Sequence, residues 1–181
     1  MEAILATDIN FGISKDGKIP WKSKKDMSFF FNKTKNNVVI MGKTTYFSLP
    51  EQFRPLKDRL NIVLTTNPCL YMNNTEYIYP NLIFTDDDTI NFHVHQNRED
   101  FLKTYPFLSS NFKIFIIGGK QIYEKYILLC STVWVTTIKK NYSCDLFFNY
   151  DYKQQFKDEL VEEDDELKIV EWKKKFYNFY S

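Results

Sequence analysis

Short apolar segments alternate along this chain with segments of helical periodicity, and this alternation constrains the fold more than any other feature. The apolar segments are rich in isoleucine and valine and end abruptly in polar residues, which is typical of strands buried on both faces of a sheet. We expect strands at Ala3–Ala6, Val38–Met41, Ile62–Leu64, Ile114–Ile117 and Val133–Ile138. We expect helices between them at Lys24–Lys35, Thr44–Leu49, Arg98–Tyr105 and Lys120–Leu129. The order predicts an α/β fold with a mostly parallel central sheet flanked by helices.

The C-terminal segment has a different pattern, because two strand-like segments follow one another with no helix between them. They are Phe156–Glu162 and Lys168–Tyr180, and an acidic run at 163–166 separates them. This pattern predicts an antiparallel hairpin with a solvated acidic turn.

The stretch from Asn67 to Ser110 is rich in asparagine, aspartate and threonine and shows no clear periodicity. We expect a divergent surface insertion at about 68–111. His93 and His95 are expected in a loop or an edge strand, because two imidazoles without a third ligand make a poor metal site. The aspartates at 86–88 are expected in a solvated turn, because no calcium-loop pattern follows them. The sequence therefore predicts no metal site.

The length and charge exclude several classes of protein. The chain has 181 residues, which suits a single domain at 1–181. Its net charge of +1 gives no concentrated basic surface for nucleic acid or acidic membranes. Three cysteines without a C-x-x-C pair suggest neither a disulfide framework nor a thiolate zinc site. With no secretory signal and no long apolar stretch, we expect a cytoplasmic protein.

Two predicted strands end in glycine immediately before a predicted helix. Gly42 follows the strand at 38–41, and Gly118-Gly119 follows the strand at 114–117. Helix N-termini attract anions and glycine allows close backbone approach, so the two junctions together suit a ligand with several phosphates. Each junction alone is also common for structural reasons, and the two standard nucleotide-binding loops are absent.

Asp26 is the only acid between Gly17 and Pro50, an interval that contains seven lysines. One interpretation is a helix cap, in which Ser23 and Asp26 form a capping box. The other is a pocket carboxylate, because Met27 and Phe30 lie beside Asp26 on a helical wheel. Burial would raise its pKa and nearby lysines would lower it, and the sequence does not decide between these effects.

A set of motifs in fixed order resembles dihydrofolate reductase from about residue 4 to residue 148. The motifs are Ile4-Leu5-Ala6, N-F-G-I-S-K-D-G-K-I-P-W, Asp26-Met27-x-x-Phe30, V-I-M-G-K-T-T-Y, R-P-L-K-D-R-L-N-I-V-L-T-T, I-I-G-G-K-Q-I-Y, V-T-T-I and S-C-D-L-F-F. The resemblance implies reduction of 7,8-dihydrofolate to 5,6,7,8-tetrahydrofolate with NADPH, which supplies one-carbon carriers for thymidylate and purine synthesis. It also implies that antifolate inhibitors bind, and we expect a monomer.

The resemblance assigns the substrate site. Asp26 would hold the pterin, Trp21 would hold water near it, and Thr136 would donate its hydroxyl to the carboxylate. Arg59 would clamp the glutamate tail of the substrate; from local sequence alone it would be taken for a solvated charge. The other residues expected around the substrate are Ile4, Leu5, Ala6, Met27, Phe30, Phe31, Leu49, Pro50, Leu56 and Ile117.

The resemblance also assigns the cofactor site. The two glycine junctions would hold the NADPH phosphates. In the second junction, the peptide bond between Gly118 and Gly119 is expected to be cis. Ala6, Ile13 and Tyr123 would lie near the nicotinamide, and Lys43 and Thr65 near the 2′-phosphate. The further residues expected at the cofactor are Gly17, Gly42, Thr44, Thr45, Leu64, Thr66, Ile117, Gly118, Gly119, Lys120, Gln121 and Ile122.

Two departures from the family pattern concern the cofactor. Ser14 stands where the family often has glycine, so closure of the N-terminal loop is expected to differ. Thr66 stands where many relatives carry an arginine against the 2′-phosphate. No acid follows the strand Ile62–Leu64 until Glu76, so NADPH is still favoured over NADH. Two alternatives are a reductase of another heterocycle with the same fold and a non-catalytic module that binds folate or a nucleotide.

Overall fold

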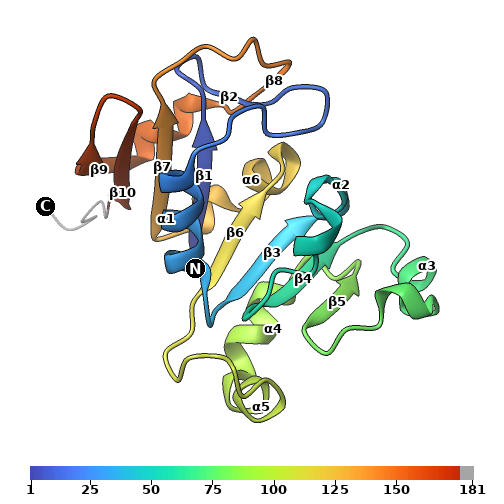
Figure 1. Cartoon of the computed structure of the whole chain (residues 1–181). Helices are drawn as coiled ribbons and strands as arrows, with labels where there is room; N and C mark the ends of the chain where they lie inside the picture. The colour runs from blue at the N-terminus through green and yellow to red at the C-terminus, as the bar shows by residue number, and fades with distance from the viewer. Residues whose placement is uncertain (176–181) are drawn as a thin grey trace, which may run out of the picture.

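The computed structural model describes residues 1–175 and contains an eight-stranded sheet of order β5-β4-β3-β6-β1-β7-β10-β9 (Figure 1). Its strands are β1 (Glu2–Thr7), β3 (Val38–Gly42), β4 (Leu60–Leu64), β5 (Leu82–Thr85), β6 (Ile114–Gly118), β7 (Thr132–Ile138), β9 (Phe156–Glu163) and β10 (Leu167–Lys174). The strands from β5 to β7 in this order are parallel, and β10 and β9 are antiparallel additions at one edge. The predicted mostly parallel sheet is confirmed.

The four predicted helices are present, although the segment 120–129 divides into an α-helix and a short 3₁₀ helix. The α-helices are α1 (Lys24–Thr34), α2 (Lys43–Ser48), α3 (Cys69–Met72), α4 (Ile90–Gln96), α5 (Arg98–Thr104) and α6 (Lys120–Tyr126). The 3₁₀ helices are η1 (Glu51–Phe53), η2 (Thr75–Tyr77), η3 (Ile127–Leu129) and η4 (Tyr150–Gln155). A separate two-stranded sheet pairs β2 (Gly12–Ser14) with β8 (Leu146–Phe147).

Alternate residues of the parallel strands pack on opposite faces of the sheet, as the two-residue period of a strand requires. Val38 and Ile40 join the larger core cluster, to which α4 and α6 also contribute side chains. Val39 and Met41 join the cluster on the other face, together with side chains from α1 and α2. Both faces are therefore covered, and α1 and α2 share one face, in front of the sheet in Figure 1.

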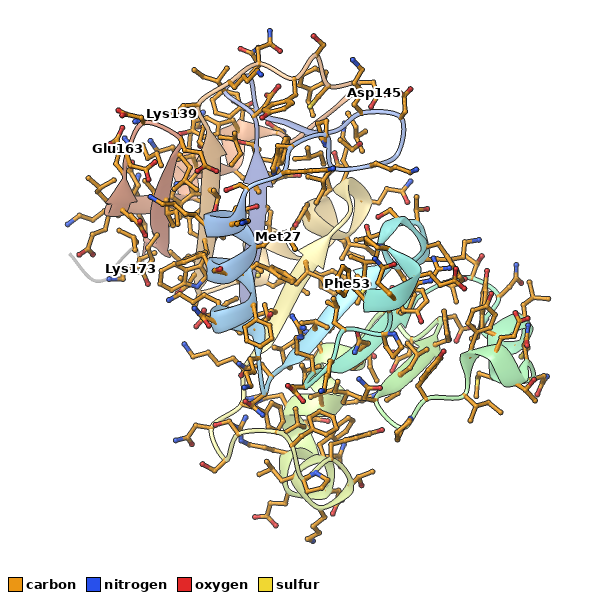
Figure 2. The ribbon with its side chains drawn as sticks, viewed as in Figure 1. Met27, Phe53, Lys139, Asp145, Glu163 and Lys173 are labelled. Carbon is orange, nitrogen blue, oxygen red and sulfur yellow. The ribbon has the colours of Figure 1, made fainter. Side chains whose placement is uncertain are left out.

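The C-terminal strands form the predicted hairpin. β9 and β10 pair along their length, and Trp172 of β10 is buried in the larger core cluster. The acidic turn lies at the surface, where Glu163 and Lys139 are paired at 2.8 Å (Figure 2). The expected end of the second strand at Tyr180 lies outside the described residues.

The stretch from Asn67 to Ser110 contains regular structure that the sequence did not reveal. It includes β5, which extends the parallel sheet beside β4, and the helices α3 and α4, whereas α5 matches the helix predicted at 98–105. The expectation of a loop or edge strand at 93–95 was wrong, because these residues lie in α4. Val94 is fully buried and Ile90, one helical turn earlier, packs against the same core cluster. This spacing of four stabilises a helix although the local sequence alternates as a strand would.

Candidate active site

The residues singled out above converge at the carboxyl ends of three adjacent parallel strands. Ala6 lies near the end of β1, Gly42 ends β3 and Gly118 ends β6. Ligands of open α/β sheets bind beyond this edge. Figure 2 shows Met27 of α1 and Phe53 of η1 on the facing sides of their elements, and both side chains are more than half exposed. Apolar side chains therefore border this edge from both directions.

Asp26 lies in the predicted capping box of α1, where one of the two hydrogen bonds of the box is present. Its backbone N–H donates to Oγ of Ser23 at 3.2 Å, which caps α1. This cap leaves the Asp26 carboxylate free. Burial raises the pKa of that carboxylate, the Thr136 and Trp21 side chains lower it in part, and Glu166 raises it further. Burial thus outweighs the effects that favour the charged form.

The surroundings of Asp26 supply further polar groups. Thr136 is buried on β7, in register with Ala6 of β1. Trp21 is also buried, and within residues 1–175 its indole Nε1–H has no hydrogen-bond partner. A buried donor without a partner is uncommon and is usually satisfied by ordered water or a ligand. The arrangement can therefore bind a polar group or a water molecule beside the carboxylate.

The expected substrate wall is largely assembled on one face of the sheet. Ile4, Leu56 and Ile117 are buried in one cluster, and Phe30 and Leu49 pack against it. Among the other expected wall residues, Met27, Phe31 and Pro50 are exposed.

Leu5 is not part of this wall. Its side chain packs in the cluster on the opposite face of the sheet, because it alternates with Ile4 along β1. Only the backbone of Leu5 can lie at the site.

Arg59 is buried, with 5% of its surface exposed, so local sequence alone would have misjudged it. Its Nη1 donates to Oγ1 of Thr34 at 3.1 Å, and its guanidinium lies 5.3 Å from the Phe31 ring centroid. No carboxylate within 4.0 Å pairs with it in the described part of the chain. Burial lowers the pKa of Arg59 to about 10, and Asp58 partly opposes this. A cation buried without an ionic partner suits an anionic ligand.

The two glycine junctions lie side by side because β3 and β6 are neighbouring parallel strands. A Cβ added to Gly42 would lie 3.1 Å from Ile122, and one added to Gly119 would lie 3.0 Å from Oγ1 of Thr45. The predicted cis peptide bond between Gly118 and Gly119 is confirmed. The close approach leaves no room for larger side chains and exposes backbone at both corners, which fits a cofactor with several phosphates.

The remaining expected cofactor residues divide between the two sides of these junctions. On the β1 side, the Tyr123 hydroxyl is buried and donates to the carbonyl oxygen of Ile4 at 2.8 Å. Ile13 lies in β2, and Gly17 is exposed with φ of +72°. The others lie at or just after the ends of β3, β4 and β6 and are at least partly accessible: Lys43, Thr44, Leu64, Thr65, Thr66, Lys120 and Gln121.

Sequence reasoning missed Asp8 and Asp145, which hold the N-terminal loop. Oδ1 of Asp8 accepts from the N–H groups of Asn10 and Gly12, and its Oδ2 accepts from Tyr142 N–H at 3.0 Å. Asp145 Oδ2 accepts from the N–H of Asp16 at 2.7 Å. The position of Asp8 directly after a strand was the available signal.

The structure holds no cluster of three metal-ligating side chains within residues 1–175. Among the residues described, every helix is too short or too polar to span a bilayer.

Comparison with known proteins identifies the family. A family model described as dihydrofolate reductase matches residues 1–179. Dihydrofolate reductase of Heliothis virescens is 35% identical over 176 residues, covering 91% of this chain and 85% of that protein. The enzyme of Schistosoma mansoni is 33% identical over 157 residues, covering 82% and 77%.

Two further matches differ in extent or in identity. The bifunctional dihydrofolate reductase-thymidylate synthase of Daucus carota is 35% identical over 155 residues, although this chain spans only 27% of its length. Dihydrofolate reductase of Enterococcus faecalis, solved with NADP(H) and RAB-propyl, has a TM-score of 0.66 at 22% identity, covering 96% of this chain and 95% of that one; it supports the fold. By the family model and by these relatives, the chain belongs to the dihydrofolate reductase family.

Proposed function

We propose that this chain reduces 7,8-dihydrofolate to 5,6,7,8-tetrahydrofolate with NADPH. NADPH supplies the hydride that reaches C6 of the pterin, while N5 gains a proton. The observation that carries the proposal is the free, half-buried Asp26 carboxylate beside Thr136 and Trp21, at the strand ends where a family member binds its ligands.

Asp26 binds the edge of the pterin. A carboxylate accepts two hydrogen bonds from a planar edge that presents a ring N–H and an amino group. The Thr136 hydroxyl orients the carboxylate, and the unpartnered Nε1–H of Trp21 holds a water molecule near it. That water delivers the proton to N5, which the nearby negative charge makes more basic.

The apolar wall and Arg59 bind the rest of the substrate. Met27, Phe30 and Leu56 enclose the pterin and the benzoyl ring. Arg59 pairs with the α-carboxylate of the glutamate tail, because it is a buried cation stacked against aromatic rings with no carboxylate partner in the part described. A heterocycle without an acidic tail would leave this charge unpaired, which argues against the alternative substrate class.

The chain holds NADPH along the ends of β1, β3, β6 and β4. Gly42–Thr45 and Gly118–Gln121 contact the phosphates, supported by the close fit of the two glycine corners. Ala6, Ile13 and Tyr123 border the nicotinamide and exclude water from it. The adenosine lies along Leu64–Thr66, with Lys43 and Thr65 at the 2′-phosphate.

The same interpretation extends to the domain content, oligomeric state, ligands and compartment of the protein. We propose that it acts as a single reductase domain and a monomer, with small-molecule ligands that include antifolates and without nucleic-acid partners. The thiols of Cys69, Cys130 and Cys144 are free, which suits a reducing compartment such as the cytosol.

The test is the loss of NADPH absorbance on addition of dihydrofolate. The wild-type chain should oxidise NADPH steadily and only when dihydrofolate is present. Asp26→Asn should lower kcat at neutral pH by at least about a hundredfold, because the variant lacks the charge that favours N5 protonation. Asp165→Asn removes the same charge from the exposed hairpin turn and should leave kcat unchanged. Tight binding of dihydrofolate without turnover in the wild type would instead support a binding module.

A further inference from the structure

The ends of β4 and β5 place two distant parts of the sequence side by side. The strands are parallel neighbours (Figure 1), and Leu64 is in register with Thr85. The Thr65 N–H donates to the Thr85 carbonyl at 2.9 Å. The residues that follow β4, Thr65 and Thr66, therefore leave the sheet beside those that follow β5, which begin with Asp86.

This neighbourhood overturns one step of the sequence argument. Along the chain, the first acid after β4 is Glu76, and its distance from the strand favoured NADPH over NADH. In the structure Thr65 bonds to Thr85, the last residue of the strand that pairs with β4, and Asp86 directly follows Thr85. Parallel pairing thus brings a carboxylate to the place where an α/β enzyme selects between the 2′-hydroxyl and the 2′-phosphate.

The three aspartates that follow β5 differ in whether they have an ion-pair partner. Asp87 pairs with His93 at 2.7 Å and also accepts from Thr89, and Asp88 pairs with Lys125. Asp86 is exposed and has no ion-pair partner among residues 1–175. Lys43, after β3, is the cation proposed for the 2′-phosphate, and Thr66 adds no charge.

The chemistry of the two cofactors differs only at this position. NADPH carries a 2′-phosphate with between one and two negative charges near neutral pH, and a carboxylate nearby repels it. NADH carries a 2′-hydroxyl, which donates a hydrogen bond to a carboxylate. Thr66 beside the unpaired Asp86 therefore weakens the binding of NADPH and strengthens the binding of NADH.

We propose that Thr66 and Asp86 set the cofactor preference, weakening discrimination against NADH so that NADH is a second hydride donor for this reductase. The inference rests on the proposed function, because it assumes that adenosine lies along Leu64–Thr66. Lys43 keeps NADPH binding, and the unpaired Asp86 accepts a hydrogen bond from the ribose of NADH.

The test measures binding by titration calorimetry, independently of turnover. The probes are NADPH, NADH, adenosine 2′,5′-bisphosphate and 5′-AMP, each titrated into the wild-type protein, Asp86→Asn, Thr66→Arg and the control Glu99→Gln. Glu99 is an exposed acid on α5, thirteen residues beyond Asp86 along the chain.

The wild type should bind the bisphosphate no more than about tenfold more tightly than 5′-AMP, because a single exposed cation contributes little. Asp86→Asn should strengthen bisphosphate binding and weaken 5′-AMP binding. Thr66→Arg should widen the ratio by about tenfold to a hundredfold, as a charge-assisted bond to phosphate does. Glu99→Gln should match the wild type.

Two results would overturn the inference in distinguishable ways. If the wild type prefers the bisphosphate by more than about a hundredfold and Asp86→Asn changes neither affinity, the inference fails while NADPH-dependent turnover still stands. If no probe binds and dihydrofolate causes no NADPH oxidation, the proposed function fails with it.

Discussion

Replacing Asp8 tests whether one buried carboxylate holds the N-terminal loop against the rest of the molecule. Asp8 is fully buried after β1 and accepts three backbone hydrogen bonds. Two of these, from Asn10 and Gly12, end on Oδ1 at 2.9 Å, and the third, from Tyr142, ends on Oδ2 at 3.0 Å. The side chain thus joins the loop before β2 to the loop after β7.

The geometry predicts an order of effects. Asp8→Asn can keep an oxygen at the Oδ1 position and so keep two of the three bonds, at a cost of about 1–2 kcal/mol in unfolding free energy. Asp8→Ala loses all three and leaves the buried Gly12 N–H without a partner, at a cost of about 3–4 kcal/mol. Urea denaturation at neutral pH measures both values, with Asp165→Asn as the exposed control.

The pH dependence gives a second check on the same residue. Burial raises the pKa of Asp8, but the backbone N–H groups of Tyr142, Gly12 and Asn10 lower it more, so it lies below 3.8. A lowered pKa means that this stabilisation is present above about pH 4 and is lost as the pH falls through the folded-state pKa. The difference in unfolding free energy between wild type and Asp8→Asn should therefore shrink as the pH falls through this range. Equal effects of the two variants, each below about 0.5 kcal/mol, would refute the role of the carboxylate.

Three other changes have outcomes that the structure predicts. Asp26→Asn should raise the Tm at neutral pH while it lowers kcat. Because the pKa of Asp26 is raised, its contribution to the stability of the wild type falls as the pH rises above 3.8. An unchanged Tm of the wild type between acid and neutral pH would contradict this. Arg59→Ala should raise the KM for dihydrofolate much more than that for NADPH, and Arg59→Lys should recover only part of the loss; equal changes for both ligands would argue against the clamp. Gly12→Ala should destabilise the fold by about 1–3 kcal/mol, because its Cβ would collide with Cys144, and Cys144→Gly should restore most of the urea midpoint; no restoration would place the strain elsewhere.

The local predictions held where a short segment contained enough information to determine its own structure. The Ser23 cap, the strand at 38–41 and the helix beginning at 120 depend on periodicity and on hydrogen bonds within a few residues. The stretch from Asn67 to Ser110 was unreadable because β5 is stabilised by pairing with β4 and not by its own pattern. For the same reason, α4 was mistaken for a loop or edge strand, since burial of Val94 decided its structure.

In the candidate site, too, some features could be predicted from local sequence and others could not. The local sequence and the family resemblance together predicted which residues carry the chemistry, because the spacing of Asp26 before its phenylalanines and the two glycine junctions is local. The sequence by itself also determined the α/β class, because buried parallel strands need continuous apolar segments. These features depend on side-chain type and on distances of a few residues along the chain.

Only the tertiary structure decided the electrostatic state of those residues. It showed that burial outweighs the Thr136 and Trp21 side chains and so raises the pKa of Asp26, that Arg59 is buried without a carboxylate partner in the described residues, and that Leu5 faces away from the site. It also placed Asp86 beside Thr65 through the pairing of β4 with β5. Desolvation and charge interaction depend on distance in space, and a sequence does not state which distant residues become neighbours.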